Sequence, residues 1–180
     1  MRHDVIAREQ SVLENLISKA PKQGYRSLVS LSLISELLRL VKLAGEVLAK
    51  TECSVRGKGS CISGGSGEKY CHTGCYGYRV VEKSGISTLF RYTDRPLAIS
   101  AGENFLKIST KLYSIELMGS RVRAVLRDVP KELEVDLADS DSLATSAHLF
   151  KITLPELIRE LEVANVNLST CLRMSAIACS

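Results

Sequence analysis

This sequence of 180 residues contains no tryptophan, only three histidines and only two glutamines. Its longest apolar region, residues 28–49, is interrupted by four charged residues, which excludes a membrane-spanning helix: Glu36, Arg39, Lys42 and Glu46. Residues 1–16 carry charges throughout, where a secretory signal would carry an apolar run. These absences predict a cytoplasmic protein without a membrane partner. Scarce glutamine beside abundant Arg, Lys and Glu is typical of thermophile proteins, whose cytosol tolerates disulfides.

Signatures of catalysis are also missing. There is no H-E-x-x-H, no G-x-S-x-G and no C-x-x-C, and the glycines near Lys58 and Lys69 do not follow the order of a phosphate loop. His148 lies in a short apolar segment, as core histidines often do. Asp139 and Asp141 precede a predicted helix, where they are typical of a cap rather than of a metal pair. The sequence predicts a non-enzymatic protein with no cofactor other than the zinc considered next.

The densest motif is the Cys/Gly-rich segment 53–75, which holds four of the six cysteines: Cys53, Cys61, Cys71 and Cys75. Their x7, x9 and x3 spacings are unusual for a zinc site, which needs four converging ligands. Disulfides need only cysteines that approach closely, and six is an even number. We therefore favour disulfides, with zinc bound by these four cysteines and free thiols as the alternatives. Cys171 and Cys179 could pair with each other or stay reduced. Each alternative makes this segment structural.

Periodicity predicts an α+β fold. Apolar residues recur at helical spacing through residues 3–20, where Glu9 falls on the apolar line, and again through residues 27–50. The wide apolar arc of residues 28–49 predicts a central core helix, or alternatively an oligomer interface. Two hairpins with turns at Ser84–Gly85 and Gly119–Ser120 follow. Thr153, Pro155 and Glu156 predict the start of a helix that ends near Ala164, after a shorter one that ends at Phe150.

The predicted organisation is thus an N-terminal helical pair (1–52), the Cys/Gly-rich loop (53–75), and an antiparallel sheet of about four to five strands with C-terminal helices (76–180), in one compact domain. Charge is unevenly distributed along it. Residues 76–127 carry nine Lys and Arg against four Asp and Glu, a net of +5, whereas residues 128–162 carry three against nine, a net of −6.

Strand alternation predicts that the cations gather on one face of this sheet. The core face would carry residues such as Ile86, Thr88, Phe90 and Leu126, and acids such as Glu82 and Glu116 would fall on the opposite parity or in loops. The open face would carry Lys83 together with the residues that we predict to contact nucleic acid: Arg79, Arg91, Lys107, Lys111, Tyr113, Arg121, Arg123 and Arg127.

Two functions follow from this pattern. A basic sheet face with tyrosines, Tyr113 or Tyr92, within reach suits a nucleic acid, DNA or RNA, because phosphates release counterions and bases stack on rings. The protein would then be a nucleic-acid-binding or nucleoprotein accessory factor. The alternative is an assembly subunit that binds a protein partner or oligomerises through helix 28–49. Open sheet faces are also commonly rich in Lys and Arg for structural reasons, and the acidic C-terminal third could cover this one.

Overall fold

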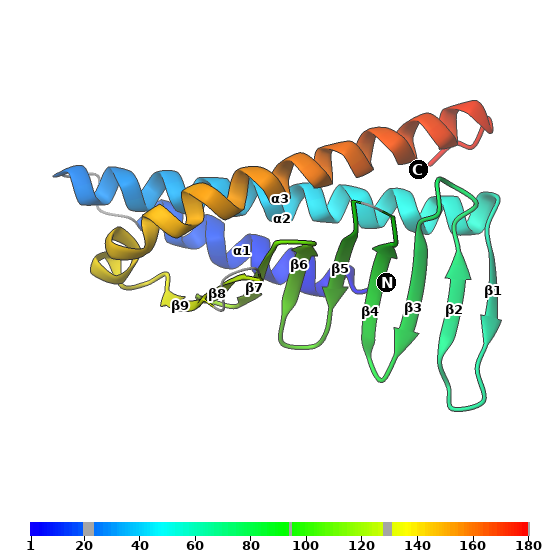
Figure 1. Ribbon diagram of the computed structural model, residues 1–180, viewed down its shortest axis with the longest axis horizontal. Helices are drawn as coiled ribbons and strands as arrows, with labels where there is room; N and C mark the ends of the chain where they lie inside the picture. Colours follow the sequence, from blue (N-terminus) through cyan, green and yellow to red (C-terminus); the bar gives the residue numbers. More distant parts are fainter. Residues whose placement is uncertain (20–23, 94, 128–130, 180) are drawn as a thin grey trace.

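Three helices lie across one face of a nine-stranded antiparallel sheet in the computed structural model, which describes residues 1–19, 24–93, 95–127 and 131–179 (Figure 1). The opposite face of the sheet carries no helix of this described part of the chain. The strands run across the helices and follow one another along the length of the helical layer. None of the helices built from the described residues combines the length and apolarity that crossing a bilayer requires.

The helical layer consists of α1 (His3–Lys19), α2 (Gly24–Gly57) and α3 (Ser140–Met174). The helix α1 runs antiparallel to α2, and α3 runs parallel to α2 (Figure 1). A side chain at Gly45 of α2 would place its Cβ 2.9 Å from Ile6 of α1, so glycine permits this close approach. Lys50 of α2 donates a hydrogen bond of 2.6 Å to Asn165 of α3.

The central position of α2 confirms the prediction of a core helix. Its inward residues are completely buried within the chain: Leu37, Leu40, Val41, Ala44 and Val47. The other two helices cover it on two sides, and its remaining side faces the sheet (Figure 1). A wide apolar arc is what such a helix requires, because several elements pack on it at once.

The sheet is a simple meander in which every strand pairs with the next one along the chain. Its strands are β1 (Ser60–Ser63), β2 (Lys69–His72), β3 (Arg79–Lys83), β4 (Ile86–Arg91), β5 (Leu97–Ala101), β6 (Leu106–Thr110), β7 (Tyr113–Met118), β8 (Arg121–Leu126) and β9 (Lys131–Asp136). The turns predicted at Ser84–Gly85 and Gly119–Ser120 join β3 to β4 and β7 to β8. Ser84 and Gly85 both have positive φ, the backbone that two-residue hairpins prefer.

The structure corrects the predicted sheet of four to five strands, although the α+β class fits. Two of the additional strands, β1 and β2, are formed by the segment that was predicted to be a loop. Two more, β5 and β9, had been read as breaks and as an acidic stretch. The hairpin predicted around Gly119–Ser120 implies one continuous strand over residues 105–117, but a turn at Lys111–Leu112 divides this stretch into β6 and β7. That turn places the residues of β7 on the faces opposite those predicted.

The two predicted C-terminal helices are also corrected, because α3 is one helix of 35 residues with Pro155 inside it. Thr153 does not cap a helix start. Its hydroxyl donates a hydrogen bond of 3.1 Å to the carbonyl of Leu149, one turn earlier. Proline usually ends a helix because it lacks an N–H. Here Leu154, Leu157 and Phe150 are buried on either side of it, so packing maintains the helix through this point.

Candidate nucleic-acid interface

The open face of the sheet is the face without helices in the described part of the chain. Its side chains form rows of residues that lie opposite one another on neighbouring strands. One row crosses all nine strands as Ile62, Tyr70, Val81, Thr88, Ser100, Lys107, Glu116, Arg123 and Glu134. The neighbouring row is Ser60, His72, Arg79, Phe90, Ala98, Ser109, Ser114, Val125 and Glu132. Taken together, the two rows carry aromatic and cationic side chains over β1–β4, mainly small side chains in the middle of the sheet, and charged side chains of both signs over β6–β9.

The first part of the open face, over β1–β4, carries an aromatic patch formed by Ile62, Tyr70, His72, Arg79, Phe90 and Tyr92. The side chains of Ile62, Tyr70 and Tyr92 are 71%, 41% and 83% exposed. The rings of Phe90 and Tyr92 lie with their centroids 5.0 Å apart. The short strands β1 and β2 present these side chains outward because the alternate residues, Cys61 and Cys71, face the helices and form a disulfide across the pair.

The charged side chains that β1–β4 present on the open face are all cationic. Arg79 stands directly between His72 and Phe90 in its row, and Lys83 lies on the same face two positions further along that strand from Val81. Among the residues that β1–β4 present on this face, no carboxylate occurs, and neither Arg79 nor Lys83 has an ion-pair partner in the described part of the chain. An anion approaching the open face over β1–β4 therefore meets Arg79 and Lys83, which form no ion pair with the described residues.

Two open hollows meet at His72 and Arg79. One, of about 160 Å³, lies on the open face beside Ile62, Tyr70 and Phe90. The other, of about 390 Å³, lies at the β2–β3 loop, and both are lined by His72 and Arg79. The oxygen Oγ of Ser60 and the nitrogen Nε2 of His72 are 2.6 Å apart, which orients the imidazole. A ligand can thus reach His72 and Arg79 both from the open face of the sheet and from the side of the β2–β3 loop.

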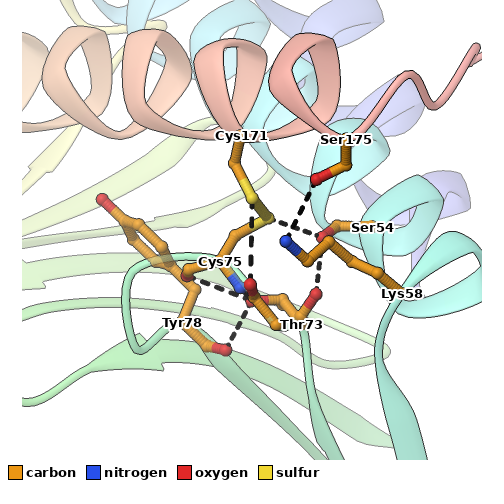
Figure 2. The surroundings of a disulfide bond; sticks show 8 residues. Ser54, Lys58, Thr73, Cys75, Tyr78, Cys171 and Ser175 are labelled. Carbon is orange, nitrogen blue, oxygen red and sulfur yellow. Dashed lines mark hydrogen bonds between the residues drawn. A yellow bond between two sulfur atoms is a disulfide. The ribbon is translucent and has the colours of Figure 1, made fainter.

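The loop between β2 and β3 is fixed to the helices by a disulfide and buried hydrogen bonds (Figure 2). Cys75 in the loop is bonded to Cys171 of α3. The hydroxyl of Ser54 in α2 donates a hydrogen bond of 2.7 Å to the carbonyl of Thr73, and both residues are fully buried. This loop joins the strands that carry His72 and Arg79. The positions of these two side chains therefore depend on the helical layer beneath.

Tyr78, at the start of β3, completes this support. Its side chain is buried, and its hydroxyl accepts a hydrogen bond of 3.4 Å from Asn167 of α3. The guanidinium of Arg91 lies 5.3 Å from the centre of its ring, in a cation–π contact. Arg91 also donates a hydrogen bond of 3.0 Å to the carbonyl of Tyr76. Arg91 is therefore engaged on the helix side of the sheet.

The second part of the open face, over β6–β9, carries a charge ladder formed by Lys107, Glu116, Arg121, Arg123, Glu132 and Glu134. Lys107, Glu116, Arg123 and Glu134 are consecutive partners across four strands. Arg121 and Arg123 form ion pairs of 3.2 and 3.0 Å with Glu134 and Glu132. Opposite charges paired across strands stabilise a sheet, and they also cancel much of the field that a polyanion would feel.

The structure therefore divides the residues predicted to bind nucleic acid. It places Arg79, Lys107, Arg121 and Arg123 on the open face, as the alternation predicted, but only Arg79 lies away from the acids. Arg91 and Tyr113 lie on the helix side, paired with Leu97 and Leu126. Lys111 and Arg127 lie in turns. Glu116, predicted to face away, lies on the open face. The acidic C-terminal part does not cover this face: β9 extends it, and α3 lies behind it.

Four residues of the patch were missed or misplaced by the sequence reasoning: Ile62, Tyr70, His72 and Phe90. The first three lie in the segment predicted to be a loop, and its two four-residue strands show no regular alternation of polar and apolar residues. Alternation assigned Phe90 to the core face together with Ile86 and Thr88, but the register places all three on the open face. Leu89 lies on the core face instead, opposite Val80 and Ile99. The strand β4 has apolar residues of both parities, so its sequence alone does not identify the inner face.

All six cysteines form disulfides, which confirms the prediction of disulfides. The pairing considered for Cys171 with Cys179 is wrong. Cys53 pairs with Cys179, Cys61 with Cys71, and Cys75 with Cys171. The two C-terminal cysteines thus bond to the Cys/Gly-rich segment 53–75 rather than to each other. The zinc alternative needs thiolates at Cys53, Cys61, Cys71 and Cys75, and a sulfur already bonded to sulfur is not a thiolate.

Comparison with models of known protein families finds no match, and comparisons with curated proteins and with solved structures find none either.

Proposed function

We propose that the protein is a non-enzymatic nucleic-acid-binding or nucleoprotein accessory factor that binds through the open face of β1–β4. The observation that supports this most is the placement of Arg79 between His72 and Phe90. This placement brings Arg79, a cation without an ion-pair partner among the described residues, next to the exposed rings of the aromatic patch. Nucleic acids offer the complementary pair of features, a regular line of phosphates and flat apolar bases.

In this proposal the two parts of the open face have different roles. Arg79 and Lys83 contact phosphates, and the rings beside them contact bases or sugars. The charge ladder over β6–β9 stabilises the sheet and contributes little to binding, because each arginine there already faces a carboxylate. Binding therefore concentrates at the end of the sheet that the disulfides hold, which differs from the evenly basic face expected from the sequence.

The alternative function, an assembly subunit that oligomerises through helix 28–49, is less well supported. Most of the apolar residues of helix 28–49 that would form an oligomer interface are buried by the chain itself, and Leu37, Leu40 and Val41 are completely buried. An acidic protein partner on the aromatic patch would still fit the charge of this face. The same binding experiment separates the two functions.

The test compares two charge reversals across a salt series, with single-stranded and duplex oligonucleotides of DNA and RNA as ligands. Arg79→Glu should weaken binding, and the slope of log K against log salt should fall by about 0.7 to 0.9 for the lost phosphate contact. The matched control is Arg123→Glu, which reverses an arginine of the same sheet face within the charge ladder. It should change affinity and slope much less.

Two results would contradict the proposal. If the wild-type protein does not retard any oligonucleotide at low salt, nucleic-acid binding is ruled out and the assembly-subunit function replaces it. If Arg123→Glu weakens binding as much as Arg79→Glu does, the attraction is general and the aromatic patch has no special role. Melting curves of both variants check that the fold is retained. Arg79→Glu should change stability by less than about 0.5 kcal/mol, whereas Arg123→Glu should lower it more, because it removes the ion pair with Glu132 and places like charges opposite one another.

A further inference from the structure

The aromatic patch exposes more apolar side-chain surface to water than the middle of the same sheet face does. Ile62 and Tyr92 are 71% and 83% exposed, and Tyr70 is 41% exposed. By contrast, the middle of the same face carries Ala98, Ser100, Ser109 and Ser114, which are small and expose little apolar surface. Contiguous apolar side chains on one part of a surface usually mark a binding site, because exposing them to water is unfavourable.

The register sets the spacing of the rings. Tyr70 lies opposite Val81, and Phe90 lies opposite Arg79, two residues earlier on the same strand. Two strand spacings across and two residues along correspond to about 12 Å between the two backbone positions. At this distance Tyr70 and Phe90 do not stack on each other. The surface between them consists of Val81 and Arg79, so flat groups can lie on the rings while an anion is held between them.

The chemistry of the ligand follows from these two features. Phosphates alone would satisfy Arg79 and Lys83 but would leave the rings exposed. A duplex presents phosphates outside and keeps its bases stacked inside, so the rings of a flat sheet would find no base faces. An unpaired strand offers both at once, since each base has a flat face that stacks on aromatic side chains regardless of its identity.

Resting on the proposed function, we infer that the ligand of the aromatic patch is single-stranded nucleic acid, with unpaired bases stacked on Tyr70, Phe90 and Tyr92 while Arg79 holds the phosphate between them. The recognition has little sequence preference, because stacking on rings is tolerant of base identity. The strand lies across β2–β4, and its path continues toward the hollow at the β2–β3 loop, which Arg79 and His72 also line.

The test uses three ligands of equal length and charge per strand: poly-dT, the same strand with abasic sites, and a duplex, with poly-U in a parallel arm to identify DNA or RNA. Poly-dT should bind at least about fivefold more tightly than the abasic strand for each stacked base. The chain contains no tryptophan, so tyrosine emission can be followed directly. Poly-dT should quench this emission, and the abasic strand should not.

Leucine substitutions locate the effect. Tyr70→Leu and Phe90→Leu remove a ring while keeping apolar volume, and each should weaken poly-dT binding about fivefold or more without changing abasic binding. Tyr113→Leu is the control, because Tyr113 lies on the helix side of the sheet. It should leave poly-dT binding unchanged.

The possible failures are distinguishable. If abasic and duplex ligands bind as tightly as poly-dT, base stacking is refuted, while the proposed phosphate binding stands. If Tyr113→Leu weakens poly-dT binding as much as Tyr70→Leu, the bases do not lie on the patch. If no nucleic acid binds at all, the proposed function itself fails.

Discussion

At the scale of single residues, Glu9 shows how a charged side chain can belong to the core. It lies on the apolar line of α1 and is completely buried. Its Oε1 accepts a hydrogen bond of 3.0 Å from the backbone N–H of Gly119, in the turn between β7 and β8, and lies 3.2 Å from Arg8. This carboxylate therefore connects α1 to the turn that joins β7 and β8.

We predict that Glu9→Ala lowers the free energy of unfolding by about 1–3 kcal/mol, because it leaves the Gly119 N–H without a partner. Urea denaturation without reductant measures this. The control is Glu14→Ala, on the exposed side of the same helix, which should change stability by less than about 0.5 kcal/mol. Equal effects of the two substitutions would show that the hydrogen bond to the turn contributes nothing.

Residue-level predictions from the sequence succeeded where arginines of one parity mark the open face of a strand. In β8 and β3 the alternation placed Arg79, Arg121 and Arg123 on the open face correctly. It failed for Tyr113 and Glu116, which follow an unrecognised turn at Lys111–Leu112. A shift of one residue moves every later side chain to the other face, so a single missed turn is enough to misplace a whole strand.

At the scale of the elements, α2 organises the molecule. The two other helices pack on it, and the sheet lies against its remaining side (Figure 1). Neighbouring leucines differ in their surroundings: Leu37 is completely buried, whereas Leu38 is only partly buried at the margin of the core. This pair allows the core role of the helix to be tested with matched chemistry.

We predict that Leu37→Ala destabilises the protein by about 2–5 kcal/mol, through lost apolar burial and the cavity that remains. Leu38→Ala should cost clearly less, because its side chain keeps part of its contact with water. Thermal and urea unfolding measure both, and light scattering records the oligomeric state. If Leu37→Ala leaves stability unchanged but dissociates an oligomer, α2 is an interface rather than a core helix.

Long elements with strong periodicity could be predicted, and short ones could not. The helical period placed α1 and most of α2, and the strongest alternation placed β3, β4, β6 and β8. The strands β1 and β2 have only four residues each and lie among glycines, which usually indicate loops. Pairing with β3 and a disulfide between Cys61 and Cys71 hold them in the sheet. Such tertiary constraints are not visible in local sequence.

At the scale of the whole molecule, the disulfides are concentrated at one end. Cys53–Cys179 and Cys75–Cys171 connect segments separated by 126 and 96 residues, whereas Cys61–Cys71 spans only 10. All three lie at the end formed by β1–β3 and the last turns of α2 and α3, which also carries the aromatic patch (Figure 1). Reduction should therefore loosen the proposed binding surface before it loosens β6–β8.

We predict that the three bonds lower the intact mass by two hydrogens each, and that removing them destabilises the protein in order of loop length. In the chain-entropy model, replacing Cys75 and Cys171 by serine costs about 4–5 kcal/mol, and replacing Cys61 and Cys71 costs about 2–3 kcal/mol. Denaturation of the two double variants measures the difference. Free thiols with bound zinc in the purified protein would contradict the disulfides. Hydrogen exchange on the reduced protein should rise first in β1–β3. Uniform exchange along the sheet would instead show that its two ends depend on the disulfides equally.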